Sequence, residues 1–179
     1  MGAPHTPREN ALLAGLPPDA YRRVAAGLTE TDLSAGNVLR PPYGCESHFH
    51  FVGSGIVSLL SVEPDGHTTE VGLVGPEGGL GLALVLGGAG PPLEATIQSR
   101  TRVWRADAAF LRSEFGRGGA LQRNLLRYTE ALMTQFAQTV ICARFHSVEC
   151  QVTRWLLLTL QRLRSDTLSM TQDTIAQLL

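Results

Sequence analysis

Long apolar runs are missing from this sequence. No stretch of apolar residues is long enough to cross a bilayer, and Met1–Asn10 lacks the hydrophobic segment of a signal peptide. Lysine is absent too: all 15 basic residues are arginine, a preference that indicates codon bias more than function. The lack of these apolar segments argues against a membrane partner and against secretion. It predicts a cytoplasmic location.

Cysteine is scarce, and neither sign of charge dominates. Cys45, Cys142 and Cys150 are widely spaced and form no CxxC pair, which predicts reduced thiols rather than a zinc or redox site. The net charge of −1 excludes a general attraction to nucleic acid, so any contact with DNA must come from a local surface. With 44% hydrophobic and 17% charged residues, the composition is that of a globular protein with a real core.

Turn residues recur about every ten residues between Leu28 and Ala106, and short apolar runs separate them. This rhythm predicts an antiparallel barrel or sandwich. The glycine-rich segment Gly78–Leu86 breaks the rhythm and predicts a short helix between tight loops. The predicted strands are Ser47–Val52, Ile56–Val62, Thr68–Val74, Leu93–Gln98 and Thr101–Trp104.

Helical patterns stand on both sides of the strands. Asp107 is a suitable N-cap for one of them, and a pattern without proline or glycine runs from Ala120 to His146. A short strand, Leu168–Met170, and the cap Thr171 precede the last pattern. The predicted helices are Ala11–Leu13, Asp19–Ala26, Ala108–Phe115, Ala120–His146, Val148–Leu163 and Gln172–Leu179.

The long helix Ala120–His146 carries two stripes of apolar residues, which predict two partners. We expect the chain's own barrel and the same helix of a second subunit, and assign the heptad-spaced stripe to the dimer. A helix buried within one domain is the alternative. The predicted dimer stripe is Leu121, Leu125, Tyr128, Leu132, Gln135, Thr139 and Cys142; the second stripe is Leu126, Met133, Phe136 and Val140.

Three segments resemble the Crp/Fnr family of bacterial transcription regulators. Glu70–Gln98 (EVGLVGPEGGLGLALVLGGAGPPLEATIQ) resembles its phosphate-binding cassette, and His146–Leu160 (HSVECQVTRWLLLTL) its hinge and the first helix of its DNA-binding domain. Leu168–Leu179 (LSMTQDTIAQLL) resembles the opening of its winged helix-turn-helix. The resemblance implies an α+β fold: an antiparallel β-barrel of the double-stranded β-helix, cyclic-nucleotide-binding-like type at residues 10–119, a dimerisation helix at 120–146, and a partial DNA-binding domain at 147–179.

The cassette implies an effector pocket from which one group is missing. In cyclic-nucleotide-binding relatives a glutamate holds the ribose, an arginine neutralises the phosphate, and glycines make tight turns. Glu77 matches the glutamate, but Leu93 stands where the arginine would be. We therefore expect an unidentified small-molecule effector and no tight binding of cyclic AMP or cyclic GMP. The implied pocket residues are Gly75, Glu77, Gly78, Gly81, Leu93, Glu94 and Thr96.

Other effectors of the family lack their residues here. An iron–sulfur cluster needs about four cysteines, and no pattern favours a histidine as a haem ligand, so the sequence predicts no cofactor. The resemblance implies a homodimer that binds DNA through its complete C-terminal domain. Thr171 and Gln172 would contact phosphates. Because the helix that reads bases would follow Leu179, we expect this chain to bind DNA weakly.

Two other functions stay open. One is a sensing or scaffolding domain that regulates by protein contact; a native stop codon after Leu179 would favour it. The other is a cupin-like metalloenzyme, because His48 and His50 are two residues apart on a predicted strand and share a face. However, Phe51–Ser61 lacks the glutamate that such enzymes require. No GxSxG motif supports a hydrolase, and we predict that the protein is not an enzyme.

Overall fold

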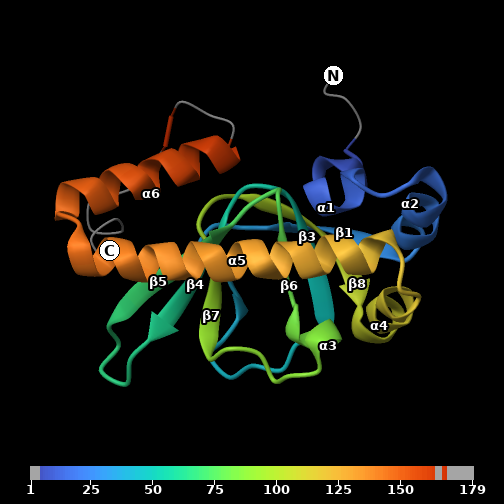
Figure 1. Ribbon diagram of the computed structural model, residues 1–179, viewed down its shortest axis with the longest axis horizontal. Coiled ribbons are helices and arrows are strands. Elements are labelled where there is room, and N and C mark those ends of the chain that lie inside the picture. The colour runs from blue at the N-terminus through green and yellow to red at the C-terminus, as the bar shows by residue number, and fades with distance from the viewer. Residues whose placement is uncertain (1–4, 164–166, 169–179) are drawn as a thin grey trace.

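The computed structural model describes residues 5–163 and 167–168. Within these residues the chain forms two four-stranded antiparallel sheets with helices around them (Figure 1). One sheet has the order β1 (Leu28–Leu33), β8 (Thr101–Asp107), β3 (His48–Ser54), β6 (Gly79–Leu80). The other has the order β2 (Val38–Arg40), β7 (Leu93–Ile97), β4 (Val57–Val62), β5 (Thr68–Val74). The predicted α+β class is confirmed, with the barrel divided into two sheets.

Six α-helices surround the sheets in the described part of the chain. They are α1 (Ala11–Ala14), α2 (Pro18–Ala25), α3 (Ala83–Leu86), α4 (Ala108–Gly116), α5 (Ala120–Phe145) and α6 (Val148–Leu163); a short 3-10 helix, η1 (Pro7–Glu9), precedes α1. Figure 1 shows α5 crossing the whole molecule beside the sheets, and α6 turning back along it. None of these helices has the length and apolar character that a bilayer span requires.

The two sheets share one core, because alternate residues of their strands point to the same interior. In β7, Leu93, Ala95 and Ile97 are buried, whereas Glu94 and Thr96 on the other face are partly exposed. The central strand β3 contributes further buried residues. The cluster joins residues of both sheets, among them Phe49, Phe51, Val52, Leu59, Ala95, Ile97 and Val103.

Helix α5 lies close to the sheets because glycines leave room for its aromatic rings. A Cβ atom on Gly78 would lie 2.3–2.5 Å from atoms of the Tyr128 ring, and one on Gly72 would lie 2.6 Å from the Phe136 ring. The Tyr128 hydroxyl donates a hydrogen bond to the Gly79 carbonyl at 3.0 Å. The glycines of the predicted cassette therefore serve close helix packing as well as turns.

Asn10 joins the first helix to the sheets. Its side-chain oxygen accepts hydrogen bonds from the N–H groups of Leu12 and Leu13, which caps α1. Its amide nitrogen donates to the carbonyls of Val52, at 2.9 Å, and Gly78, at 2.7 Å. This fully buried side chain thus satisfies polar backbone groups of three separate segments.

The five predicted strands and the predicted helices up to Leu163 are present within a few residues of their expected ends. Asp107 caps α4 as expected, accepting from the N–H groups of Ala109 and Phe110. The segment Gly78–Leu86 is only half helical, because β6 precedes α3 in it. Strands β1, β2 and β6 were not expected from the sequence. Of the predicted strand Leu168–Met170 only Leu168 is described, and the predicted helix Gln172–Leu179 lies outside the described residues.

We predict that Gly78→Ala lowers the free energy of unfolding by about 1–3 kcal/mol, since the added methyl group overlaps the Tyr128 ring. Gly116→Ala at the end of α4 is the matched control. Nothing lies within 4 Å of the added Cβ there, and we expect a change near zero. Chemical denaturation of both variants checks this, and equal stabilities would contradict the close packing of α5.

Candidate functional site

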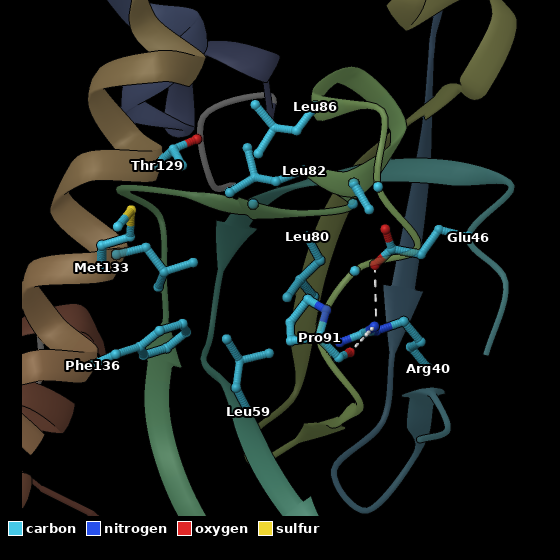
Figure 2. A pocket seen from close by; sticks show the side chains of 16 residues that line it. Arg40, Glu46, Leu59, Leu80, Leu82, Leu86, Pro91, Thr129, Met133 and Phe136 are labelled. Carbon is cyan, nitrogen blue, oxygen red and sulfur yellow. Dashed lines mark hydrogen bonds and ion pairs between the residues drawn. The ribbon is translucent and has the colours of Figure 1, made fainter. Parts of the chain in front are cut away.

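A cavity of about 300 Å³ lies between α5, the short helix α3 and the strands. Most of its wall is apolar, and Figure 2 shows leucines on the barrel side facing Met133 and Phe136 of α5. A cavity of this size and character is typical of a small-molecule site. Its lining consists of Arg40, Glu46, Leu59, Gly79, Leu80, Gly81, Leu82, Ala83, Leu86, Gly88, Gly90, Pro91, Thr129, Leu132, Met133 and Phe136.

The charged groups in this wall are Arg40 and Glu46, and they pair with each other. Arg40 Nε lies 3.3 Å from Glu46 Oε1, and Arg40 Nη1 donates to the Pro91 carbonyl at 3.0 Å (Figure 2). Their side chains are only 10% and 13% exposed, so the pair is largely removed from water. Burial raises the pKa of Glu46, and the Arg40 charge opposes that shift. The pair leaves the cavity without net charge.

Of the seven predicted pocket residues, only Gly81 lines the cavity. Leu93 belongs to the core, and Glu94 lies on the other face of β7, where Thr96 donates to it. Glu77 is outside the cavity, bound to Arg162 of α6 at 2.6 Å, and Gly75 leaves room for that arginine. The assignment of Glu77 as the carboxylate of the pocket is therefore corrected.

Most of the residues that line the cavity were not expected there from the sequence. Arg40 and Glu46 come from β2 and the loop after it, a region without a recognised strand pattern. Leu82, which directly follows Gly81 and begins the turn into α3, was not singled out. The one local signal for Leu82 in the sequence is the glycine before it. Gly81 adopts a positive φ of +110°, which makes the turn that brings Leu82 to the cavity.

The predicted dimer stripe of α5 faces the chain's own barrel. Leu121, Leu125, Tyr128 and Cys142 are buried within the single chain, and Leu132 lines the cavity. Gln135 exchanges two hydrogen bonds with the Leu73 backbone, at 2.6 and 3.1 Å. Thr139 donates to the Gln135 carbonyl. The assignment of this stripe to the dimer is therefore wrong.

The opposite face of α5 is the one that lacks a partner in the described chain. We call Leu126, Met133, Val140 and Ile141 the outer stripe; their exposed fractions are 47%, 66%, 68% and 46%. Leu126, Met133 and Val140 repeat every seven residues, which is the spacing of a helix-to-helix seam. The prediction of two apolar faces is correct, but the stripe expected to meet a second subunit is the one that packs within the chain, and Phe136 of the second stripe packs there too.

Helix α6 packs on the outer side of the second sheet. Trp155 forms a small core with Leu60 and Leu73, and Arg162 makes its ion pair with Glu77. Thr159 Oγ1 is buried in α6 without a hydrogen-bond partner in the described residues. The predicted DNA contacts, Thr171 and Gln172, lie outside the described residues.

Glu70 of β5 is a buried carboxylate next to α6. Burial raises its pKa to about 7, against the opposing effects of the Ser58 hydroxyl, which donates to it, and of the positive charges of Arg162 and Arg154. Because both arginines belong to α6, the charge of Glu70 is coupled to the position of this helix.

His48 and His50 lie side by side on β3, with ring centroids 6.3 Å apart. Burial, together with the nearby charges of His48 and Arg105, lowers the pKa of His50 to about 4. Within residues 5–163 and 167–168, no three His, Cys, Asp or Glu side chains come together in a way that could hold a metal ion. The metalloenzyme hypothesis therefore has no third ligand in this part of the chain.

Comparison with solved structures finds the same fold in several bacterial regulators. A protein from Eubacterium rectale described as a transcriptional regulator of the Crp/Fnr family has a TM-score of 0.77 and 12% identity, over 96% of this chain and 80% of that one. CLP, the c-di-GMP-responsive global regulator of Xanthomonas campestris, has a TM-score of 0.73 and 13% identity, over 89% and 83%. FixK2 of Bradyrhizobium japonicum has a TM-score of 0.68 and 19% identity, over 84% and 76%.

No protein-family model matches the sequence, and no curated protein matches it either. The likeness is therefore one of fold: the chain has the cyclic-nucleotide-binding-like fold of Crp/Fnr transcription regulators. At the level of the fold, this confirms the resemblance to that family.

We predict that the natural chain loses stability between about pH 5 and pH 8 as Glu70 ionises, and that Glu70→Gln removes this loss. The pKa of Glu70 is about 7 in the folded chain, against 4.5 for an ordinary glutamate. The protonated carboxyl therefore stabilises the fold fully below pH 4.5, and this contribution is lost as the pH rises through 7. At pH 8 the variant should unfold with a free energy up to ~3 kcal/mol higher than the natural chain, and at pH 5 with a similar one.

Chemical denaturation at the two pH values measures this difference. Glu63→Gln, at an exposed position in the β4–β5 turn, is the control and should behave as the natural chain does at both pH values. A Glu70→Gln variant that is less stable at pH 8 would show that the carboxylate is charged and favourable in the fold.

Proposed function

We propose that the protein is a homodimeric, ligand-responsive transcription regulator of the Crp/Fnr type. Residues 10–119 are the sensor, α5 makes the dimer, and residues 147–179 belong to the DNA-binding domain. The fold supports a regulator in general terms, and the cavity supports a small-molecule effector. DNA binding through the complete C-terminal domain, with Thr171 and Gln172 at phosphates, is part of the proposal.

The observation that carries the proposal is the double role of one segment of α5. Thr129, Leu132, Met133 and Phe136 form a wall of the cavity, and Met133 is also in the outer stripe. A molecule in the cavity therefore contacts the helix that would meet the second subunit. A ligand that binds one position of α5 better than another shifts the equilibrium between them, which is the thermodynamic requirement for a switch.

The contact of α6 with the sensor gives the switch an output. Trp155 and the Arg162–Glu77 ion pair hold α6 on the second sheet, while a two-residue joint, His146 and Ser147, connects it to α5. A shift of α5 would thus change the position of α6 relative to the sheets. In this proposal that movement reorients the DNA-binding domain.

We predict that Val140→Glu makes the protein monomeric. A two-fold seam through the outer stripe would bury two copies of the new charge, which should raise the dimer dissociation constant by about two orders of magnitude. Leu157→Glu is the control, because Leu157 on α6 is 64% exposed, nearly as much as Val140 at 68%. Sedimentation of the natural chain and both variants checks this.

A natural chain that sediments as a monomer at high concentration would contradict the proposal. If the chain is a dimer that Val140→Glu leaves intact, the subunits meet through another surface. Selection from random-sequence duplexes, carried out with the three proteins in a form that has the complete C-terminal domain, should enrich two-fold symmetric DNA sites only with the natural sequence and Leu157→Glu. Dimerisation of that form without any enrichment would favour a sensor that acts through protein contacts.

We also predict that neither cyclic AMP nor cyclic GMP binds in the micromolar range. A cyclic phosphate in the cavity would meet leucines and an arginine already paired with Glu46, and its charge would be desolvated without a free counter-ion. Isothermal titration measures this directly. Micromolar binding of either nucleotide would mean that the Arg40–Glu46 pair opens at little cost.

A further inference from the structure

The Glu46 carboxylate has one oxygen that its surroundings leave unsatisfied. Oε1 faces Arg40, but Oε2 is buried and has no hydrogen-bond partner in the described residues. Figure 2 shows the carboxylate directed toward the leucines of the cavity, with a dashed line from one oxygen only. A buried acceptor without a donor costs free energy, and a donor supplied from the cavity would recover it.

The other polar groups of the cavity wall do not supply that donor. Arg40 uses Nε for Glu46 and Nη1 for the Pro91 carbonyl. The Thr129 hydroxyl on the opposite wall donates its hydrogen to the Leu125 carbonyl and is left as an acceptor. Apart from the remaining N–H groups of Arg40, the cavity therefore offers leucine, methionine and phenylalanine surface together with hydrogen-bond acceptors.

We propose that the cavity binds an uncharged, mainly apolar molecule that carries a hydroxyl group, and that this hydroxyl donates to Glu46 Oε2. This inference rests on the proposed function, because it names the class of effector for the same cavity. An anion would meet the Glu46 carboxylate beside the only arginine of the wall, and a cation would meet Arg40. Each would lose its hydration without a free counter-charge.

The apolar wall of the cavity determines the size and the character of the rest of the ligand. One water molecule takes ~30 Å³ in the liquid, so a volume of about 300 Å³ holds on the order of ten non-hydrogen atoms. A ten-carbon chain is therefore a suitable probe. The raised pKa of Glu46 agrees with a poorly hydrated carboxylate that lacks a donor.

The test compares three probes of equal chain length by isothermal titration of the full chain at pH 8. These are 1-decanol, which has the donor; decyl methyl ether, which has none; and decanoate, which is an anion. We expect 1-decanol to bind about tenfold more tightly than either of the others, as a hydrogen bond to a charged acceptor predicts.

The Glu46→Gln variant separates a ligand-binding role from a structural one. This variant leaves Arg40 without its counter-charge, so decanoate should bind to it at least tenfold more tightly than to the natural chain. The ratio of the affinities for 1-decanol and for the ether should fall several-fold. Glu94→Gln removes one carboxylate from the outer face of β7 and should change neither ratio. Thermal unfolding establishes that both variants fold.

The comparison on the natural chain decides the matter even if Glu46→Gln does not fold. If the ether binds as tightly as the alcohol, or decanoate binds more tightly, the proposed ligand class is wrong while the cavity remains a binding site. If none of the three probes binds, the cavity is not an effector site for such molecules, and both the ligand class and the sensing role proposed above fail.

Discussion

The close approach of α5 to the sheets is the constraint on which the rest of the structure depends. Gly78 accepts the Tyr128 ring and Gly72 accepts the Phe136 ring, so the helix is fixed at two points two turns apart. The residues between these points cannot reach the sheets equally well, and part of that segment becomes a wall of the cavity. The absence of side chains at these two glycines thus creates both the packing of the helix and the space beside it.

The same constraint explains why the stripe with polar residues faces inward. β5 is an edge strand, and the N–H and C=O groups of Leu73 that its neighbour β4 leaves unpaired need partners. The amide of Gln135 supplies both a donor and an acceptor to that one residue. In the sequence, Gln135 has the spacing of a polar residue that fixes the register of a coiled coil. Periodicity gives the face of a residue but does not distinguish these two partners.

The elements were more predictable than the cavity, and the reason is the range of the interactions. Strands such as Thr68–Val74 follow from alternation and turn residues, and Asp107 from capping, all of which act within a few residues. The cavity instead combines β2, the loop after it, α3 and α5. Arg40 reaches the cavity because β2 pairs with β7, where Arg40 lies opposite Ala95. The two residues are more than fifty positions apart in the chain, and the sequence of one short strand does not predict such a distant pairing.

The position of the Arg40 guanidinium decides which kind of ligand the proposed switch can bind. Leu93 is an apolar core residue of β7, while Arg40, from the neighbouring strand β2, is already neutralised by Glu46. With no net charge in the cavity, a ligand gains little from electrostatic alignment, and most of its binding free energy must come from apolar contact. Much of that contact is with Leu132, Met133 and Phe136, which belong to α5. In such a cavity the affinity for the ligand and the position of the helix are set by the same contacts.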